Sequence, residues 1–211
     1  MTAESEGVIR FHYELEERRE PALPSRTLDE LRAWREIMRR LGLLGQCLDR
    51  YQGLGFGNIS VRCPQRSVEF VITATQTSGV DVLEDQHLTR VRDADLTEFR
   101  VTAAGPLPPS SESLTHAMIY QLTDDVDAIV HVHSPEIWHR ADAIGLPTTP
   151  EQVSYGSPAM AQATRKLLEE HRERPLSFAT LGHGDGVFAC ATSVAAAAAS
   201  LVDQLSRALR P

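Results

Sequence analysis

The run Ala128-Ile129-Val130-His131-Val132-His133 constrains the fold of this chain more than any other segment. Apolar residues surround and separate two histidines, a pattern that predicts a strand over residues 127–133. Side chains two positions apart on a strand point the same way, so Val132 is expected to face the core while His131 and His133 share one cleft. The fold must therefore present two imidazoles on one face of a sheet.

A third histidine stands between two glycines in Gly182-His183-Gly184, with strands predicted on either side over 177–181 and 186–190. Three imidazoles with room for a fourth ligand are typical of a catalytic rather than a structural zinc-type site, and neutral imidazole is the commonest metal ligand. Two histidines in a strand can also be partly solvated side chains. The third favours the hypothesis that His131, His133 and His183 bind one divalent metal ion.

Glu112 follows a Pro-rich loop in Pro109-Ser110-Ser111 and opens a helix predicted to run to about Leu122. A carboxylate there is favoured by the helix dipole, or it is a general acid/base held near the metal; the residues alone leave both roles open. His116 lies one helical turn later on the same face. We interpret it as a histidine that supports the site from behind or packs in the core, not as a direct ligand.

Two loops and the start of that helix carry groups that bind anions or oxygen-rich substrates. Their residues are Gly57-Asn58, Thr77-Ser78-Gly79 and Ser110-Ser111. Hydroxyls and backbone amides of this kind can cradle a phosphate or a carboxylate, although turn and capping chemistry explains each one taken singly. The glycines at 53–57 precede a strand, whereas a dinucleotide fingerprint follows a strand and opens a helix, so a nucleotide site is excluded.

Composition limits the class of protein. The 211 residues, 42% hydrophobic, fit one domain over 1–211. A net charge of -8 argues against nucleic acid and an anionic membrane as partners. Three cysteines far apart in sequence predict free thiols. The acidic N-terminus is not a signal peptide, and no apolar run approaches the roughly 20 residues of a membrane span. We therefore expect a cytoplasmic protein.

Short strands alternate with helices along the rest of the chain. Residues 1–24 are expected to form a strand over 8–16 and a linker marked by Pro21 and Pro24, and the capping box Thr27-Leu28-Asp29-Glu30 to start a helix. Further strands are predicted over 58–63, 68–74, 88–94 and 97–102, and further helices over 135–141, 158–172 and 193–209. Such a mixture indicates an α/β or α+β layered domain.

Taken together, the motifs resemble the class II aldolase/adducin family. The pattern consists of Gly57-Asn58-Ile59-Ser60-Val61-Arg62, Val71-Ile72-Thr73 through Thr77-Ser78-Gly79, Ser110-Ser111-Glu112 with His116, Val130-His131-Val132-His133-Ser134, Tyr155-Gly156-Ser157 and Gly182-His183-Gly184. The motifs occur in family order and cover about residues 27 to 205. Two features differ: the loop over 73–79 is longer than usual, and the stretch between His133 and Tyr155 lacks the tyrosine that sugar-phosphate aldolases contribute from a neighbouring subunit.

The resemblance implies a three-layer α/β/α fold around a central, mostly antiparallel sheet, a homotetramer, and a divalent metal, commonly zinc. It implies His131, His133 and His183 as ligands and Glu112 as the acid/base. The phosphate-binding positions it implies are Gly57, Asn58, Thr77, Ser78, Gly79, Ser110 and Ser111.

The expected function is that of a metal-dependent lyase. Such an enzyme cleaves a carbon–carbon bond of a small hydroxy-carbonyl substrate, a sugar or sugar phosphate, through a metal-stabilised enediolate. A dehydratase, an epimerase or a decarboxylase on the same fold is one alternative. A non-enzymatic, adducin-like interaction module is the other.

Overall fold

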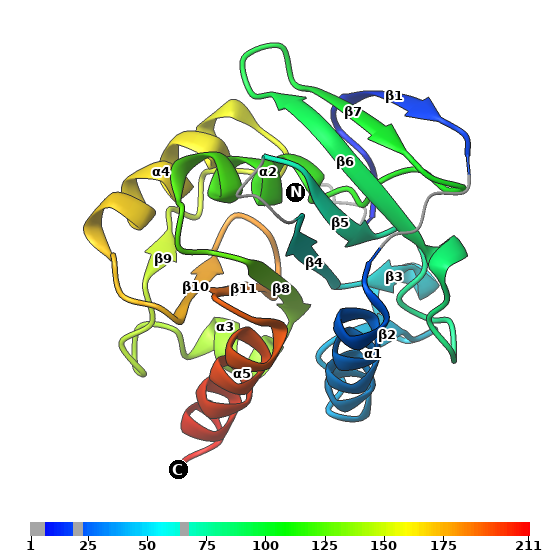
Figure 1. Ribbon diagram of the computed structural model, residues 1–211. Helices are drawn as coiled ribbons and strands as arrows, with labels where there is room; N and C mark the ends of the chain where they lie inside the picture. The colour runs from blue at the N-terminus through cyan, green and yellow to red at the C-terminus, as the bar shows by residue number, and fades with distance from the viewer. Residues whose placement is uncertain (1–6, 19–22, 64–67) are drawn as a thin grey trace.

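A nine-stranded sheet forms the centre of the protein in the computed structural model, which describes residues 7–18, 23–63 and 68–211 (Figure 1). The strand order is β1-β7-β6-β5-β4-β8-β11-β10-β9. These strands are β1 (His12–Glu16), β4 (Asn58–Arg62), β5 (Phe70–Thr73), β6 (Leu88–Asp95), β7 (Arg100–Ala104), β8 (Ala128–His133), β9 (Thr148–Thr149), β10 (Leu176–Thr180) and β11 (Gly186–Ala191). A separate hairpin pairs β2 (Gly45–Gln46) with β3 (Gly55–Phe56).

The strands are antiparallel throughout the interior of the main sheet, from β7 across to β10. Only the two edge strands pair in parallel, β1 with β7 and β9 with β10. The expectation of a mostly antiparallel sheet is therefore confirmed. β8 lies near the middle, between β4 and β11, and both of its faces are covered.

Helices cover both faces of the sheet, which confirms the three-layer α/β/α architecture (Figure 1). One face packs on α1 (Ser25–Arg40), α3 (Pro135–His139) and α5 (Val194–Ala208), and the other on α2 (Ser113–Leu122) and α4 (Pro158–Glu170). Short 3-10 turns occur at Tyr51–Gly53 and Asp85–His87.

The alternation of β8 decides what its histidines meet. Val130 and Val132 belong to the core under α1 and α5, and Ile129 belongs to the core under α2 and α4. His131 and His133 have the parity of Ile129, so they point to the α2 side. Val132 faces the core as predicted.

Several element boundaries differ from the predicted ones. β1 begins at His12 instead of residue 8, and α1 begins at Ser25 after Pro24 without a side-chain cap, so the capping box at Thr27 does not form. Pro21 lies outside the described residues. β7 begins at Arg100 because Asp95 Oδ1 accepts hydrogen bonds from two later backbone amides and closes a turn there.

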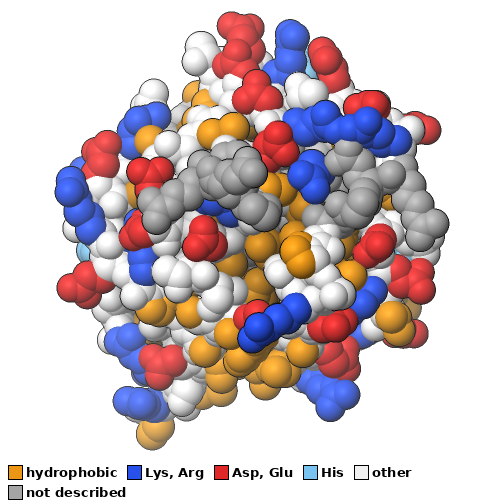
Figure 2. Space-filling model, viewed as in Figure 1, with side chains coloured by type: hydrophobic (Ala, Val, Ile, Leu, Met, Phe, Trp, Pro, Cys, Tyr) orange, Lys and Arg blue, Asp and Glu red, His pale blue; other side chains and the backbone are white. Residues whose placement is uncertain are grey.

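Acidic and basic side chains are interspersed over the face of the molecule shown in Figure 2, with apolar side chains gathered between α1 and α5. Within the described residues, none of the helices combines the length and the apolar character that crossing a membrane requires. Cys47, Cys63 and Cys190 are free thiols, as predicted.

A buried arginine fastens α1 to the loop after β5. The guanidinium Nη2 of Arg35 donates to the carbonyls of Thr77, Ser78 and Val80 at 3.0, 2.9 and 2.8 Å. Burial lowers the pKa of Arg35 to about 10, so the side chain stays charged at neutral pH. These hydrogen bonds from a charged donor hold the loop in a fixed position relative to α1.

Replacing Arg35 with Met should lower the free energy of unfolding by about 2–4 kcal/mol, because buried carbonyls lose a charged donor. Urea denaturation followed by circular dichroism measures the change. Arg40→Met is the control on the same helix, since its side chain is 79% exposed and pairs with Glu36 at the surface. That control should change stability by less than about 0.5 kcal/mol; equal effects of the two substitutions would contradict the role given to Arg35.

Candidate metal centre

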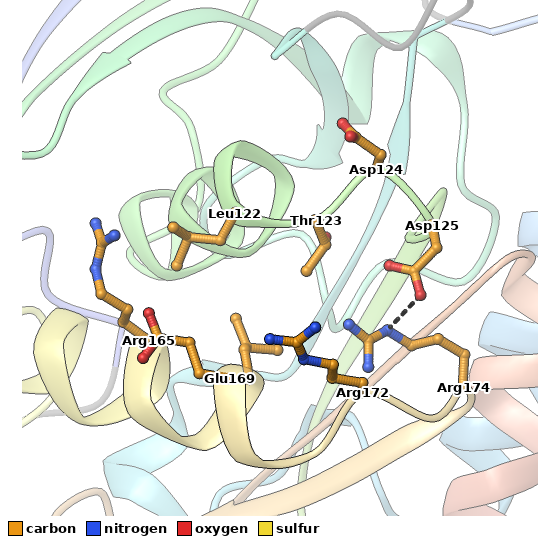
Figure 3. A pocket seen from close by; sticks show the side chains of 9 residues that line it. Leu122, Thr123, Asp124, Asp125, Arg165, Glu169, Arg172 and Arg174 are labelled. Carbon is orange, nitrogen blue, oxygen red and sulfur yellow. Dashed lines mark ion pairs between the residues drawn. The ribbon is translucent and has the colours of Figure 1, made fainter.

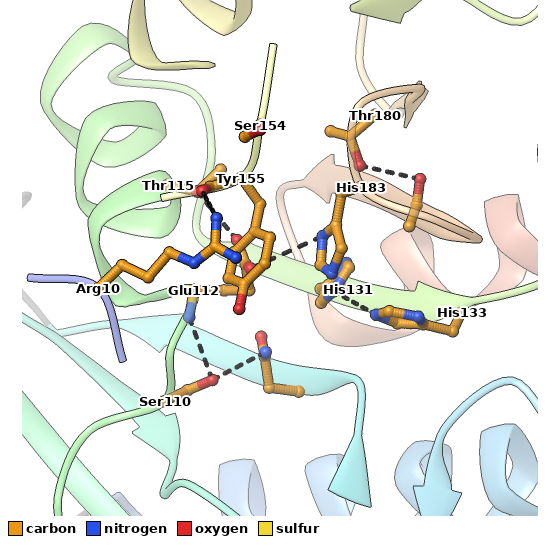
Figure 4. A network of polar contacts seen from close by, with 12 residues as sticks. Arg10, Ser110, Glu112, Thr115, His131, His133, Ser154, Tyr155, Thr180 and His183 are labelled. Carbon is orange, nitrogen blue, oxygen red and sulfur yellow. Dashed lines mark hydrogen bonds and ion pairs between the residues drawn. The ribbon is translucent and has the colours of Figure 1, made fainter. Parts of the chain in front are cut away.

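The structure brings the three predicted histidines together. His131 and His133 come from β8, and His183 comes from the turn between β10 and β11. One nitrogen of each ring lies within 4.8 Å of those of the other two. Figure 4 shows the three rings pointing toward one another, two from β8 and one from the turn. All three are buried, so they do not line the open cleft that the sequence suggested.

Backbone contacts orient the rings of His131 and His133. His131 Nδ1 lies 3.1 Å from the carbonyl oxygen of Val187, and the ring of His133 hydrogen-bonds the backbone of Gly184. A ring nitrogen that faces a carbonyl must carry the proton. His131 Nε2 is then unprotonated in the neutral ring, and it lies 3.1 Å from His133 Nε2. A lone pair in this position can accept a proton from His133 or bind a cation.

The rings are also held in the neutral form. Burial lowers the pKa of His131 and of His133 well below the ordinary value, and the nearby His183 lowers both further. A neutral imidazole has a lone pair available for a metal ion, whereas imidazolium has none. The cluster therefore has the chemistry of a ligand set rather than of a surface group.

Glu112 stands next to the third histidine. It occupies the N-cap of α2 and is buried, with Oε1 3.7 Å from His183 Nδ1. Thr115 Oγ1 donates a hydrogen bond of 3.0 Å to the other carboxylate oxygen, Oε2. These contacts place the carboxylate beside the histidine cluster.

His116 lies behind the cluster, outside the group of three. Its Nδ1 is 2.7 Å from Ser60 Oγ, and its ring packs against those of Phe70 and Phe188. Phe188 in turn stacks on His131, with ring centroids 4.2 Å apart. Burial lowers the pKa of His116 to about 3. A neutral, packed histidine that supports a ring touching His131 agrees with its predicted place.

The predicted anion-binding loops also meet. Asn58 Nδ2 donates to Ser110 Oγ at 2.9 Å, and Ser78 Oγ donates to the carbonyl of Gly57 at 2.7 Å. Thr77 Oγ1 donates to the carbonyl of Ala74. Of the seven residues predicted there (Gly57, Asn58, Thr77, Ser78, Gly79, Ser110 and Ser111), these contacts join Asn58 to Ser110 and Ser78 to Gly57, with several donors engaged inside the protein.

Two residues of the site had no predicted role. Tyr155 stacks on His183 with ring centroids 4.4 Å apart, and the Arg10 guanidinium lies 4.0 Å from the Tyr155 ring centroid (Figure 4). Arg10 Nη1 also donates to the Tyr155 carbonyl, and the Tyr155 hydroxyl donates to the Val8 carbonyl. Tyr155 is part of a motif noted in the sequence, whereas no local signal marks Arg10.

Tyr51 is a third residue without a predicted role. Its hydroxyl donates to Asp185 Oδ2 at 2.7 Å, and its ring meets the His133 ring edge-on. Burial and the hydrogen bond to Asp185 raise the pKa of Tyr51, so the phenol stays protonated. This contact links the hairpin of β2 and β3 to the turn that carries His183.

A cleft of about 400 Å³ lies away from the histidines, between the end of α2 and α4 (Figure 3). Its walls carry the arginines Arg165, Arg172 and Arg174 together with acidic residues, and an Arg174–Asp125 ion pair spans part of it. The three clustered histidines are not among its lining residues. The histidine cluster, not this cleft, has the donor set of a metal site.

Comparisons with known proteins agree with this fold. The family model described as Class II Aldolase and Adducin N-terminal domain matches residues 47–209. No curated protein sequence matches the chain.

Three solved structures are similar to this one. An L-fuculose-1-phosphate aldolase from Thermus thermophilus is 21% identical, with 88% of this chain and 91% of that chain covered and a TM-score of 0.60. A sugar-phosphate aldolase from Thermotoga maritima is 18% identical, with 87% and 92% covered and a TM-score of 0.65. The YgbL protein of Klebsiella pneumoniae, whose description leaves aldolase, epimerase and decarboxylase open, is 17% identical, with 87% and 88% covered and a TM-score of 0.61. Similarity at these identities supports the fold and not a particular reaction.

The glycines beside His183 allow a matched test of how the turn positions the ring. A Cβ on Gly182 would overlap the carbonyl of Val153, whereas a Cβ on Gly184 would have nothing within 4 Å. Gly182→Ala should lower the free energy of unfolding by about 1–3 kcal/mol, as overpacking does, and weaken zinc binding. Gly184→Ala should change neither. Chemical denaturation and zinc titration measure both properties, and unchanged behaviour of Gly182→Ala would show that the contact does not position His183.

Proposed function

The chain belongs to the class II aldolase and adducin N-terminal domain family, and on that premise we propose that it is a metal-dependent lyase. The proposed reaction is the aldol-type cleavage of a carbon–carbon bond in a small hydroxy-carbonyl compound. One observation carries the proposal: three buried imidazoles converge within 4.8 Å beside a buried carboxylate.

The donor set fits a divalent metal ion, with His131, His133 and His183 as the residues that would hold it. Two nitrogens bound tetrahedrally to one zinc ion at about 2.0–2.1 Å lie about 3.3 Å from each other, and the Nε2 atoms of His131 and His133 are 3.1 Å apart. An ion bound there supplies Lewis acidity, which stabilises negative charge developing on a substrate carbonyl oxygen.

Glu112 is the group proposed to move protons. In an aldol cleavage the hydroxyl beside the breaking bond loses its proton and becomes a carbonyl. The electron pair of that bond passes to the other fragment, whose carbon then gains a proton. Glu112 can accept the first proton and return one, because Thr115 holds Oε2 and so directs Oε1 toward His183.

Tyr155 and the segment that carries Arg10 exclude water from the histidines. His131, His133 and His183 are each at most 3% exposed, with Tyr155 stacked on the last. A dry site strengthens every charge interaction within it.

Dehydration, epimerisation and decarboxylation remain alternative reactions on the same residues. All of them require negative charge to be stabilised next to a carbonyl, and the K. pneumoniae relative is described with an epimerase and a decarboxylase as alternatives. A non-enzymatic, adducin-like module is a further alternative. The complete set of three histidines and Glu112 favours an enzyme, and a panel assay of sugars, sugar phosphates and hydroxy-acids separates the reactions.

Zinc as the native metal, a homotetramer and a cytoplasmic location stay predictions. A reducing compartment agrees with the buried free thiols of Cys63 and Cys190. Elemental analysis, light scattering after size exclusion and cell fractionation test the three points in turn.

His131→Ala should abolish stoichiometric metal binding, because two histidines alone form too weak a site. Inductively coupled plasma mass spectrometry on zinc-reconstituted, desalted protein measures it, with wild type expected to hold roughly one zinc per chain, as a site of this kind requires. His139→Ala is the control, since that histidine is exposed on α3. Metal content equal to wild type in the His131 variant would remove this residue from the ligand set.

Glu112→Gln should keep the metal and lower turnover by roughly 10²–10⁴-fold, the usual contribution of general acid–base catalysis. The shape of the side chain is retained, while its capacity to exchange a proton is lost. Turnover is measured on whichever panel compound the wild type cleaves, at saturating metal. Glu173→Gln, at an exposed position, should behave as wild type, and a fully active Glu112 variant would exclude this carboxylate from the mechanism.

A further inference from the structure

The loops that meet beside the histidines contain two glutamines that the proposed function does not use. Gln46 lies in β2, and Gln76 lies in the turn after β5. Backbone amides and hydroxyls form an anion site when they point into a common space that nothing else fills. Whether these loops can take a phosphate therefore depends on where the two carboxamides lie.

The side-chain oxygen of Gln76 occupies a position where the oxygen of an anion could accept a hydrogen bond from the Gly55 amide. Gln76 Oε1 accepts a hydrogen bond of 2.8 Å from the backbone N–H of Gly55. The residue has a φ of 56°, a conformation that favours glycine and that brings the side chain back over the loop. A phosphate would have to displace this carboxamide to reach the Gly55 amide.

Gln46 covers the second loop. A Cβ on Gly79 would lie 2.8 Å from Gln46 Cβ and 3.2 Å from its Cδ, so the glutamine stem packs directly on this glycine. The carboxamide Nε2 donates to the carbonyl of Gly53 at 2.7 Å, which ties the two loops together. The space over Gly79 is thus filled from β2.

The hydroxyls of the same region are directed into the protein. Ser78 Oγ donates to the Gly57 carbonyl, and Thr77 Oγ1 donates to the Ala74 carbonyl. Arg35 holds the carbonyls of Thr77 and Ser78 from below, so the loop does not turn these groups outward without losing those bonds. Donors that a phosphate would need are therefore already paired.

We propose that Gln46 and Gln76 are specificity-determining residues that adapt this site to a non-phosphorylated hydroxy-carbonyl substrate. Each carboxamide is neutral and offers both donors and acceptors, which match hydroxyl groups better than a dianion. The substrate class rests on the proposed lyase function. The exclusion of phosphate depends on the contacts of these loops and not on which reaction the site catalyses.

The first arm of the test uses inorganic phosphate. Isothermal titration compares wild type with the double variant Gln46→Ala/Gln76→Gly, in metal-loaded and in chelator-treated protein. Glycine is compatible with the positive φ at position 76, and circular dichroism verifies the fold. The double variant should bind phosphate at least about tenfold more tightly than wild type. Gln86→Ala, an exposed glutamine elsewhere, should match wild type.

The single variant Gln46→Ala, which leaves the backbone at 76 untouched, keeps the test valid if the double variant is unstable, and it should show part of the gain. Equal phosphate affinity in wild type and in both variants overturns the proposal.

The second arm compares L-fuculose with L-fuculose 1-phosphate on zinc-loaded protein. Wild type should have the higher kcat/KM for the sugar without phosphate, and the double variant should shift the ratio toward the phosphate ester by at least about tenfold. Preference of wild type for the ester overturns the inference. If the protein holds no metal and cleaves neither compound, the lyase function fails, and the phosphate titration still decides the role of the glutamines.

Discussion

The Nε2 atoms of His131 and His133 lie 3.1 Å apart in a buried site, and the rest of the site is arranged around this contact. Burial lowers the pKa of both histidines, which keeps the two rings uncharged. The Val187 carbonyl faces His131 Nδ1 and the Gly184 backbone hydrogen-bonds the His133 ring, so both rings are held in this orientation. Two neutral imidazoles this close can supply adjacent ligand atoms to one cation, which is why the cluster supports a metal function better than a structural one.

The sheet supplies the rigidity that this contact requires. β8 is hydrogen-bonded on both edges, with Asn58 and Phe188 in register beside His131. Phe188 stacks on that imidazole and is itself backed by Phe178 at a centroid distance of 5.3 Å. Packing of this kind restricts the rotation of the ring, so less conformational entropy is lost when a ligand binds. The fold places two of the candidate metal ligands on a strand that is hydrogen-bonded along both edges.

Short-range sequence patterns predicted those structural features that neighbouring residues determine. Alternation in 128–133 predicted both the strand and the shared face of its histidines, and the glycines around His183 predicted a turn. The capping box at Thr27 failed because Pro24 already directs the chain into the helix two residues earlier than expected. Tyr155 and Arg10 received no role because their contact joins residues 145 positions apart, and no periodicity records such a pair. No local sequence pattern pointed to Gln76 either, because its role depends on the hydrogen bond that it accepts from the Gly55 amide, 21 positions away.

The features that set this chain apart from its family's pattern are connected in space. The family model begins at residue 47, so the segment of Gly7 to Arg10 lies outside it. That segment packs on Tyr155 through Arg10, and at Gly7 it lies against the Gln76 carboxamide. This N-terminal segment therefore contacts both the tyrosine that stacks on His183 and the glutamine that accepts from the Gly55 amide. A longer loop alone would leave its carboxamide free to swing away from the Gly55 amide. Contact with the N-terminal segment restricts that motion, so the segment and the longer loop act together on one region beside the histidines.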